Sequence, residues 1–160
     1  VLDNVKLAYH WHSKYSLWGS FLRLPDYYRG EDKMNQDALE LLSVFRLDTK
    51  AQELASNLPY GEQRRLEIVR ALAAKPKLLL LDEPAAGMNP LETKELMELI
   101  GEIREKFDLT ILLIEHDMSL VMNICERIYV LDYGKIIAEG TPEEIKHNSK
   151  VIEAYLGREA

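Results

Sequence analysis

The sequence is poor in features that would place it outside the soluble globular proteins. Its single cysteine, Cys125, excludes an internal disulfide and fits a reducing compartment. No apolar run approaches the roughly 18 residues of a membrane-spanning helix. The net charge of −7 lacks the basic balance typical of nucleic-acid binders, so we expect no nucleic acid among the partners. The first residues form no signal peptide and include no initiator methionine, which favours sequence missing upstream.

What remains is the composition of one ordinary domain. The 160 residues are 47% hydrophobic and 29% charged, which is typical of a chain with a real core. Residues 1–57 are rich in aromatics, including both tryptophans, and their periodicity predicts helices, most clearly over Gly30–Leu47. Pro25 is expected to break the segment before that helix. Residues 58–160 alternate predicted helices and strands, which indicates an α/β fold with a parallel sheet.

The second part has clear local signals. Glu62–Ala74 is predicted to be helical, and Asn89-Pro90-Leu91-Glu92 is a strong helix start, with Asn as cap, Pro at the first position and Glu at the third. Asp117 and Thr141 are expected to cap two further helices. Strands are predicted at Lys77–Asp82, Leu109–Glu115, Arg127–Leu131 and Lys135–Ala138, the last two joined by a turn at Tyr133-Gly134.

The most informative stretch is Leu78-Leu79-Leu80-Leu81-Asp82-Glu83-Pro84. Four consecutive leucines predict a strand buried on both faces. Carboxylates are rarely buried without a partner, so Asp82 and Glu83 should lie at the carboxyl end of this strand, where open α/β sheets bind ligands. An acidic pair there suits a metal-bound polyphosphate, with one carboxylate for Mg²⁺ and one to orient a water.

Two further elements support a phosphate site. Leu58-Pro59-Tyr60-Gly61-Glu62 is a glycine turn that leads into a helix, and such a turn offers backbone N–H groups and the positive end of the helix dipole. His116 follows the next predicted strand. If the two strands are neighbours, its ring lies at the same sheet edge as Glu83 and can hydrogen-bond a terminal phosphate.

Taken together and in this order, these elements resemble the second half of an ATP-binding cassette (ABC) ATPase, a P-loop NTPase. Residues 58–62 look like the signature motif, usually Leu-Ser-Gly-Gly-Gln. Residues 78–83 look like the Walker B strand, 86–89 like the D-loop, and His116 like the switch histidine. More narrowly, the chain is similar to ATPase subunits of branched-chain amino-acid importers, with the lipopolysaccharide-export ATPases as relatives in pattern.

That resemblance implies specific roles. Asp82 would hold Mg²⁺ through water, Glu83 would be the general base, and His116 would contact the γ-phosphate of ATP. The signature residues Leu58, Pro59, Tyr60, Gly61 and Glu62 would close over ATP bound to a second ATPase subunit, and Asn89 would communicate across that dimer. The other implied partners are integral membrane permease subunits, which place the protein at the cytoplasmic face of the plasma membrane.

The sequence departs from the family pattern at several positions. Pro59 replaces the usual serine, so only backbone donors and Gly61 remain for phosphate. Tyr60 replaces a glycine, Glu62 a glutamine and Asn89 the D-loop aspartate.

The larger departure is the phosphate loop, G-x-x-x-x-G-K-[ST], which occurs nowhere in the 160 residues. In the resembling family it precedes the position of Val1, so the chain alone is expected to be inactive. The strand at Lys77–Asp82 would also lack a neighbour, and its apolar edge would favour self-association.

Two alternatives belong to other classes. The carboxyl-terminal lobe of an SMC-type ATPase naturally carries a signature and a Walker B strand, but it should follow a long coiled coil that residues 1–57 do not show. In a non-catalytic interaction module these motifs would be relics. The presence of both Glu83 and His116 argues against that alternative. The aromatic stretch from Tyr9 to Tyr28 is interpreted as a partner surface, with residues 1–57 as a helical subdomain that faces the membrane subunit.

Overall fold

The computed structural model describes residues 1–9 and 25–156, and it divides the chain into two compact units, Val1–Leu112 and Leu113–Ala160. Trp18 and most of the aromatic stretch lie outside the described residues, so the predicted partner surface stays a prediction. The boundary between these units, at 112/113, differs from the predicted division at 57/58. The predicted division concerns the subdomains of a complete ATPase, so it also stays a prediction. Within the described ranges, no helix combines the length and apolar character that crossing a membrane requires.

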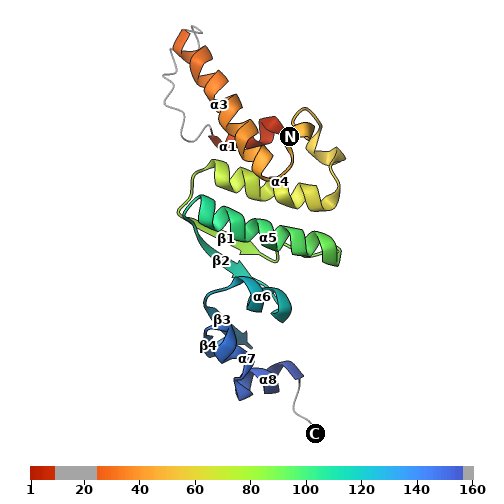
Figure 1. Ribbon diagram of the computed structural model, residues 1–160, viewed down its shortest axis with the longest axis vertical. Coiled ribbons are helices and arrows are strands. Elements are labelled where there is room, and N and C mark those ends of the chain that lie inside the picture. The colour runs from red at the N-terminus through yellow and green to blue at the C-terminus, as the bar shows by residue number, and fades with distance from the viewer. Residues whose placement is uncertain (10–24, 157–160) are drawn as a thin grey trace. The chain divides into compact units, whose positions relative to one another are not determined.

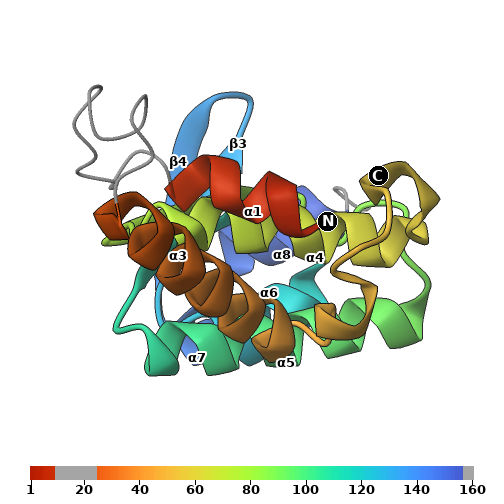
Figure 2. The ribbon, with the colours of Figure 1, turned by 90° about the horizontal axis from the view of Figure 1, so that it is seen from above.

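The first unit is built mainly from helices around one core (Figures 1 and 2). In order they are α1 (Leu2–Tyr9), α3 (Pro25–Val44), the short 3₁₀ turns η2 (Asp48–Lys50) and η3 (Ala55–Asn57), α4 (Tyr60–Ala73) and α5 (Pro90–Lys106). Helix α1 packs against both α3 and α4. Fully buried side chains from several of these elements close the core: Val5, Leu42, Phe45, Leu47, Val69, Leu96 and Ile103.

Helix α3 begins earlier than the sequence predicts. It starts at Pro25 rather than Gly30. Proline is well tolerated at the first position of a helix, because a backbone N–H there would have no partner within the helix. The helix ends at Val44, and Arg46 then adopts a positive φ of 58°, a left-handed conformation that reverses the chain. Pro25 is thus the first residue of α3, and the prediction that it breaks the preceding segment concerns residues outside the described ranges and stays a prediction.

Strands β1 (Leu78–Asp82) and β2 (Thr110–Ile114) form a two-stranded parallel sheet, joined by α5 as the crossover. The prediction that β1 is buried on both faces is wrong. Leu79 and Leu81 are buried, whereas Leu78 is 51% and Leu80 65% exposed. The four leucines are apolar enough for two covering layers, but within the described residues only one face of the strand is covered.

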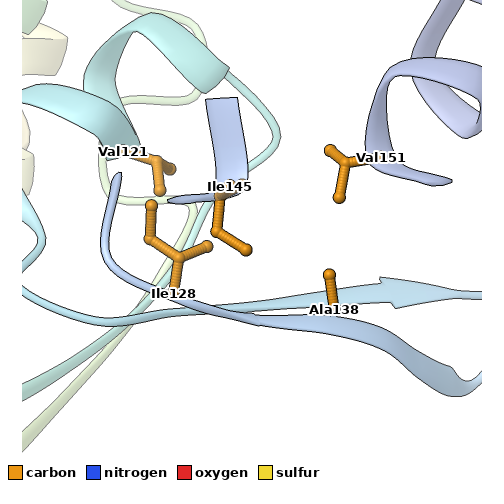
Figure 3. Packing of buried hydrophobic residues seen from close by; sticks show 5 residues of the cluster. All are labelled: Val121, Ile128, Ala138, Ile145 and Val151. Carbon is orange, nitrogen blue, oxygen red and sulfur yellow. The ribbon is translucent and has the colours of Figure 1, made fainter. Parts of the chain in front are cut away.

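The second unit consists of α6 (Met118–Ile124), the antiparallel hairpin β3 (Ile128–Asp132) and β4 (Lys135–Gly140), α7 (Pro142–Lys146) and α8 (Ser149–Leu156). The predicted turn at Tyr133-Gly134 is confirmed, and both residues have positive φ, as a type I′ hairpin turn requires. A small core holds the unit together, made of Val121, Ile128, Ala138, Ile145 and Val151 (Figure 3).

Candidate functional site

Helix α4 begins at Tyr60 with no side-chain cap. Pro59 occupies the cap position and has no acceptor oxygen in its side chain, so the first backbone hydrogen bond of the helix is Gln63 N–H to Pro59 O, at 3.0 Å. Helices α5, α6 and α7 are capped instead by Asn89, Asp117 and Thr141, as the sequence predicts. The first-turn N–H groups of α4 therefore receive no acceptor from a capping side chain, which suits an anionic ligand.

The carboxylate of Glu62 lies in this first turn and would repel such an anion. Lys50 offsets it: its Nζ lies 2.6 and 2.7 Å from the two carboxylate oxygens of Glu62. Leu58, just before the helix, is buried, and its carbonyl accepts a hydrogen bond from Gln63 Nε2 at 2.8 Å. These contacts fix the chain on both sides of Gly61, and nothing in the sequence pattern indicated the role of Lys50.

Gly61 is buried because the start of α5 lies directly against it. A Cβ placed there would come within 3.2 Å of Glu92 Oε1. The other oxygen of Glu92, Oε2, accepts the backbone N–H of Asn89 at 3.1 Å and completes the capping box of α5. Glu92 thus links Gly61 to Asn89, so the structure brings the predicted signature residues and the predicted D-loop residue together. An ion pair between the two helices, Arg65 Nη2 to Glu95 Oε2 at 2.6 Å, holds them in this arrangement.

Asn89 can be tested as a structural residue. Its Oδ1 accepts the N–H groups of Leu91 and Glu92, both at 3.0 Å. Replacing it with alanine should lower the free energy of unfolding of the first unit by about 1 kcal/mol, whereas Asn89→Asp keeps the cap and should cost much less. Urea denaturation measures the free energy of unfolding of both variants, and hydrogen exchange of the α5 amides reports the local effect. Equal losses of stability in the two variants would contradict a capping role.

Asp82 and Glu83 are exposed where β1 ends, as predicted for the carboxyl end of the strand. Glu83 has a φ of +43°, a left-handed conformation that costs a non-glycine residue energy and is concentrated at functional sites. Two turns follow, closed by hydrogen bonds from Ala86 N–H to Glu83 O and from Met88 N–H to Ala85 O, each 3.1 Å. The loop 83–88 therefore leaves the strand in a defined conformation.

The described residues fit a magnesium ion only in part. They contain no group of three or more side chains that could hold a metal by themselves. Mg²⁺ is usually bound by one or two carboxylates, with substrate phosphates and water completing its shell. A single exposed carboxylate at a strand end, as Asp82 supplies, fits that mode of binding.

His116 belongs to the second unit, and its ring is exposed, with a side-chain exposure of 78%. Its backbone carbonyl accepts a hydrogen bond from Tyr155 Oη at 2.5 Å, which ties α8 to the residues that follow β2. The units are described separately, so the predicted approach of His116 to Glu83 stays a prediction.

The chain was also compared with known protein families and structures. The protein-family model described as "ABC transporter" matches residues 3–86, and the family model described as "Branched-chain amino acid ATP-binding cassette transporter" matches residues 135–160. The chain is 50% identical over 157 residues to the high-affinity branched-chain amino acid transport ATP-binding protein LivG of Escherichia coli, covering 98% of this chain and 62% of LivG.

Other relatives extend the pattern. BraF of Pseudomonas aeruginosa, of the same description as LivG, is 43% identical over 98% of this chain and 62% of its own length. The lipopolysaccharide export ATP-binding protein LptB of Escherichia coli is 38% identical over 81% of this chain and 52% of its own length. The solved structure of MJ1267, an ATP-binding cassette of an ABC transporter, superposes with a TM-score of 0.76 at 30% identity, covering 98% of this chain and 62% of that one. The chain therefore spans less than two thirds of the length of these relatives.

Proposed function

From the premise that this chain belongs to the ABC transporter family, we propose that it supplies the signature and Walker B portion of an ATPase subunit that powers the import of branched-chain amino acids. The observation that supports this most directly is the packing of the uncapped start of α4 against the first turn of α5, through the Gly61–Glu92 contact. The descriptions of LivG and BraF as branched-chain amino acid transport proteins support the substrate. Lipopolysaccharide export is less favoured, because LptB matches a shorter part of the chain at lower identity.

The chemistry assigned to the residues is ATP hydrolysis. Asp82 would hold Mg²⁺ through water, and the bound ion would neutralise charge on the transferred phosphate. Glu83 would accept a proton from the attacking water and orient it. The first-turn N–H groups at Tyr60, Gly61 and Glu62 would bind the γ-phosphate of ATP held by a second ATPase subunit, and His116 would donate a hydrogen bond to the γ-phosphate in its own site.

The proposal extends to partners and location. Because LivG and BraF are described as transport ATP-binding proteins, we propose permease subunits and a second ATPase subunit as partners, at the cytoplasmic face of the membrane. The Mg²⁺–ATP complex is the proposed ligand of the assembled site.

The proposed function can be tested by joining the chain to the part of a relative that it does not span. The 160-residue chain should show no ATP hydrolysis, because its sequence contains no phosphate loop, whose glycines and lysine bind the β- and γ-phosphates. A fusion that places the unmatched part of Escherichia coli LivG ahead of Val1 should gain Mg²⁺-dependent ATPase activity, measured as phosphate release. Stoichiometric turnover by the chain alone, or a folded fusion that binds ATP but never hydrolyses it, would count against the proposal.

A further inference from the structure

The ring of Tyr60 lies directly on the backbone of Gly87. A Cβ placed on Gly87 would come within 3.3 Å of Tyr60 Cε1 and 3.6 Å of its hydroxyl oxygen. Gly87 also has a φ of +78°, a backbone conformation that favours glycine, and a Cβ there would crowd the Tyr60 ring. The first residue of α4 therefore contacts the loop that begins at Glu83, at a point distinct from the Gly61–Glu92 contact.

Arg64 fixes the orientation of this ring. Its Nε and Nη2 donate hydrogen bonds to Tyr60 Oη at 3.0 and 2.8 Å, and its guanidinium carbon lies 5.1 Å from the ring centroid. Nη1 is bonded in turn to Glu67 at 2.8 Å. The hydrogen bonds that the guanidinium donates to Glu67 and to Tyr60 raise the pKa of Arg64. Tyr60 is 46% exposed, yet Arg64, itself held by Glu67, fixes the position of its ring.

We propose that Tyr60 is a positioning residue that couples the start of α4 to the loop carrying Glu83, with Arg64 holding the ring on Gly87. This inference rests on the proposed function, in which α4 contacts the nucleotide of the second subunit and Glu83 acts on the nucleotide of its own. The Tyr60–Gly87 contact then joins the two ATP sites through one chain. A glycine at position 60, as in the usual signature, has no side chain that could make this contact.

The loop can transmit a displacement because it is held at several points. Hydrogen bonds close the turns at Ala86 and Met88, and Glu92 fixes Asn89 at the far end. A shift of α4 on binding phosphate moves the Tyr60 ring and therefore Gly87. Since the turns leave the intervening residues little freedom, the shift reaches Glu83, whose backbone already adopts a strained conformation.

Hydrogen exchange of the 160-residue chain, followed by mass spectrometry, tests the coupling without nucleotide. Tyr60→Leu should raise the exchange rate of the peptide spanning residues 83–89 about fivefold, because the loop loses its aromatic contact. Tyr60→Phe keeps the ring and should stay within about twofold of the parent chain. The β3–β4 hairpin serves as the internal reference and should not change.

Arg64→Lys provides a second variant in case Tyr60→Leu unfolds the first unit, which loss of protection in α3 would reveal. It removes the two-pronged bond to Tyr60 and should speed exchange of residues 83–89 about twofold, whereas Arg70→Lys, an exposed arginine on the same helix, should not. Unchanged loop exchange in Tyr60→Leu, equal effects of Leu and Phe, or equal effects of the two arginine variants would each overturn the inference. None of these results bears on ATP hydrolysis, so the proposed function stands or falls separately.

Discussion

Replacing Glu83 with glutamine should lower the kcat of the LivG fusion by at least about a hundredfold. A positioned general base typically contributes a factor of roughly 10² to 10⁴, and an amide of the same shape cannot accept the proton of the attacking water. The KM for ATP should change little, because Glu83 contacts the water rather than the nucleotide in the proposed site. Phosphate release under saturating Mg²⁺ and ATP measures the loss.

Glu105→Gln is the matched control, since Glu105 is an exposed glutamate near the end of α5. It should leave kcat within about twofold of the parent fusion. The two variants remove the same charge, so a difference between them reports position rather than net charge. A Glu83→Gln fusion that retains more than a tenth of the parent kcat would show that another group accepts the proton.

Local hydrogen bonding made much of the fold predictable. Asn89, Asp117 and Thr141 each cap a helix in the structure as the sequence indicates, because a capping side chain bonds to N–H groups only two or three residues away. The hairpin turn at Tyr133-Gly134 is local in the same sense. Such elements need no knowledge of the rest of the chain.

The features that depend on other layers were less accessible. Leu78 and Leu80 are as apolar as their buried neighbours, and periodicity cannot tell whether a covering layer is present. The positive φ of Glu83 has no sequence signal, because glutamate rarely adopts it without tertiary constraint.

The contacts around the candidate site show the same limit. The motifs indicated which residues form the signature turn and the loop after β1. They did not indicate that Glu92 would lie on Gly61 or that the Tyr60 ring would cover Gly87, since both contacts join segments about thirty residues apart. The ion pair between Lys50 and Glu62, which are 12 residues apart, was not indicated either, and it offsets a negative charge that the sequence places in the first turn of α4.

Replacing Ile145 with alanine should unfold the second unit while the first remains folded. Ile145 is 1% exposed and lies in the core formed with Val121, Ile128, Ala138 and Val151 (Figure 3). Truncating a buried isoleucine typically costs about 2–5 kcal/mol. A unit as small as Leu113–Ala160 buries a smaller share of its surface than a full domain, so a loss of this size approaches its whole stability.

Hydrogen exchange distinguishes local from global unfolding in this variant. Amides of the β3–β4 hairpin should lose protection in Ile145→Ala, while those of α4 and α5 keep it. Ile136→Ala is the matched control, because Ile136 is 61% exposed on the same hairpin and its truncation leaves no cavity. In the fusion, Ile145→Ala should also lower ATPase activity, since the hydrogen bond from Tyr155 to the His116 carbonyl depends on the folded unit. If the hairpin amides keep their protection in Ile145→Ala, the core in Figure 3 does not determine the stability of the second unit. The proposed dependence of His116 on that core would then be wrong.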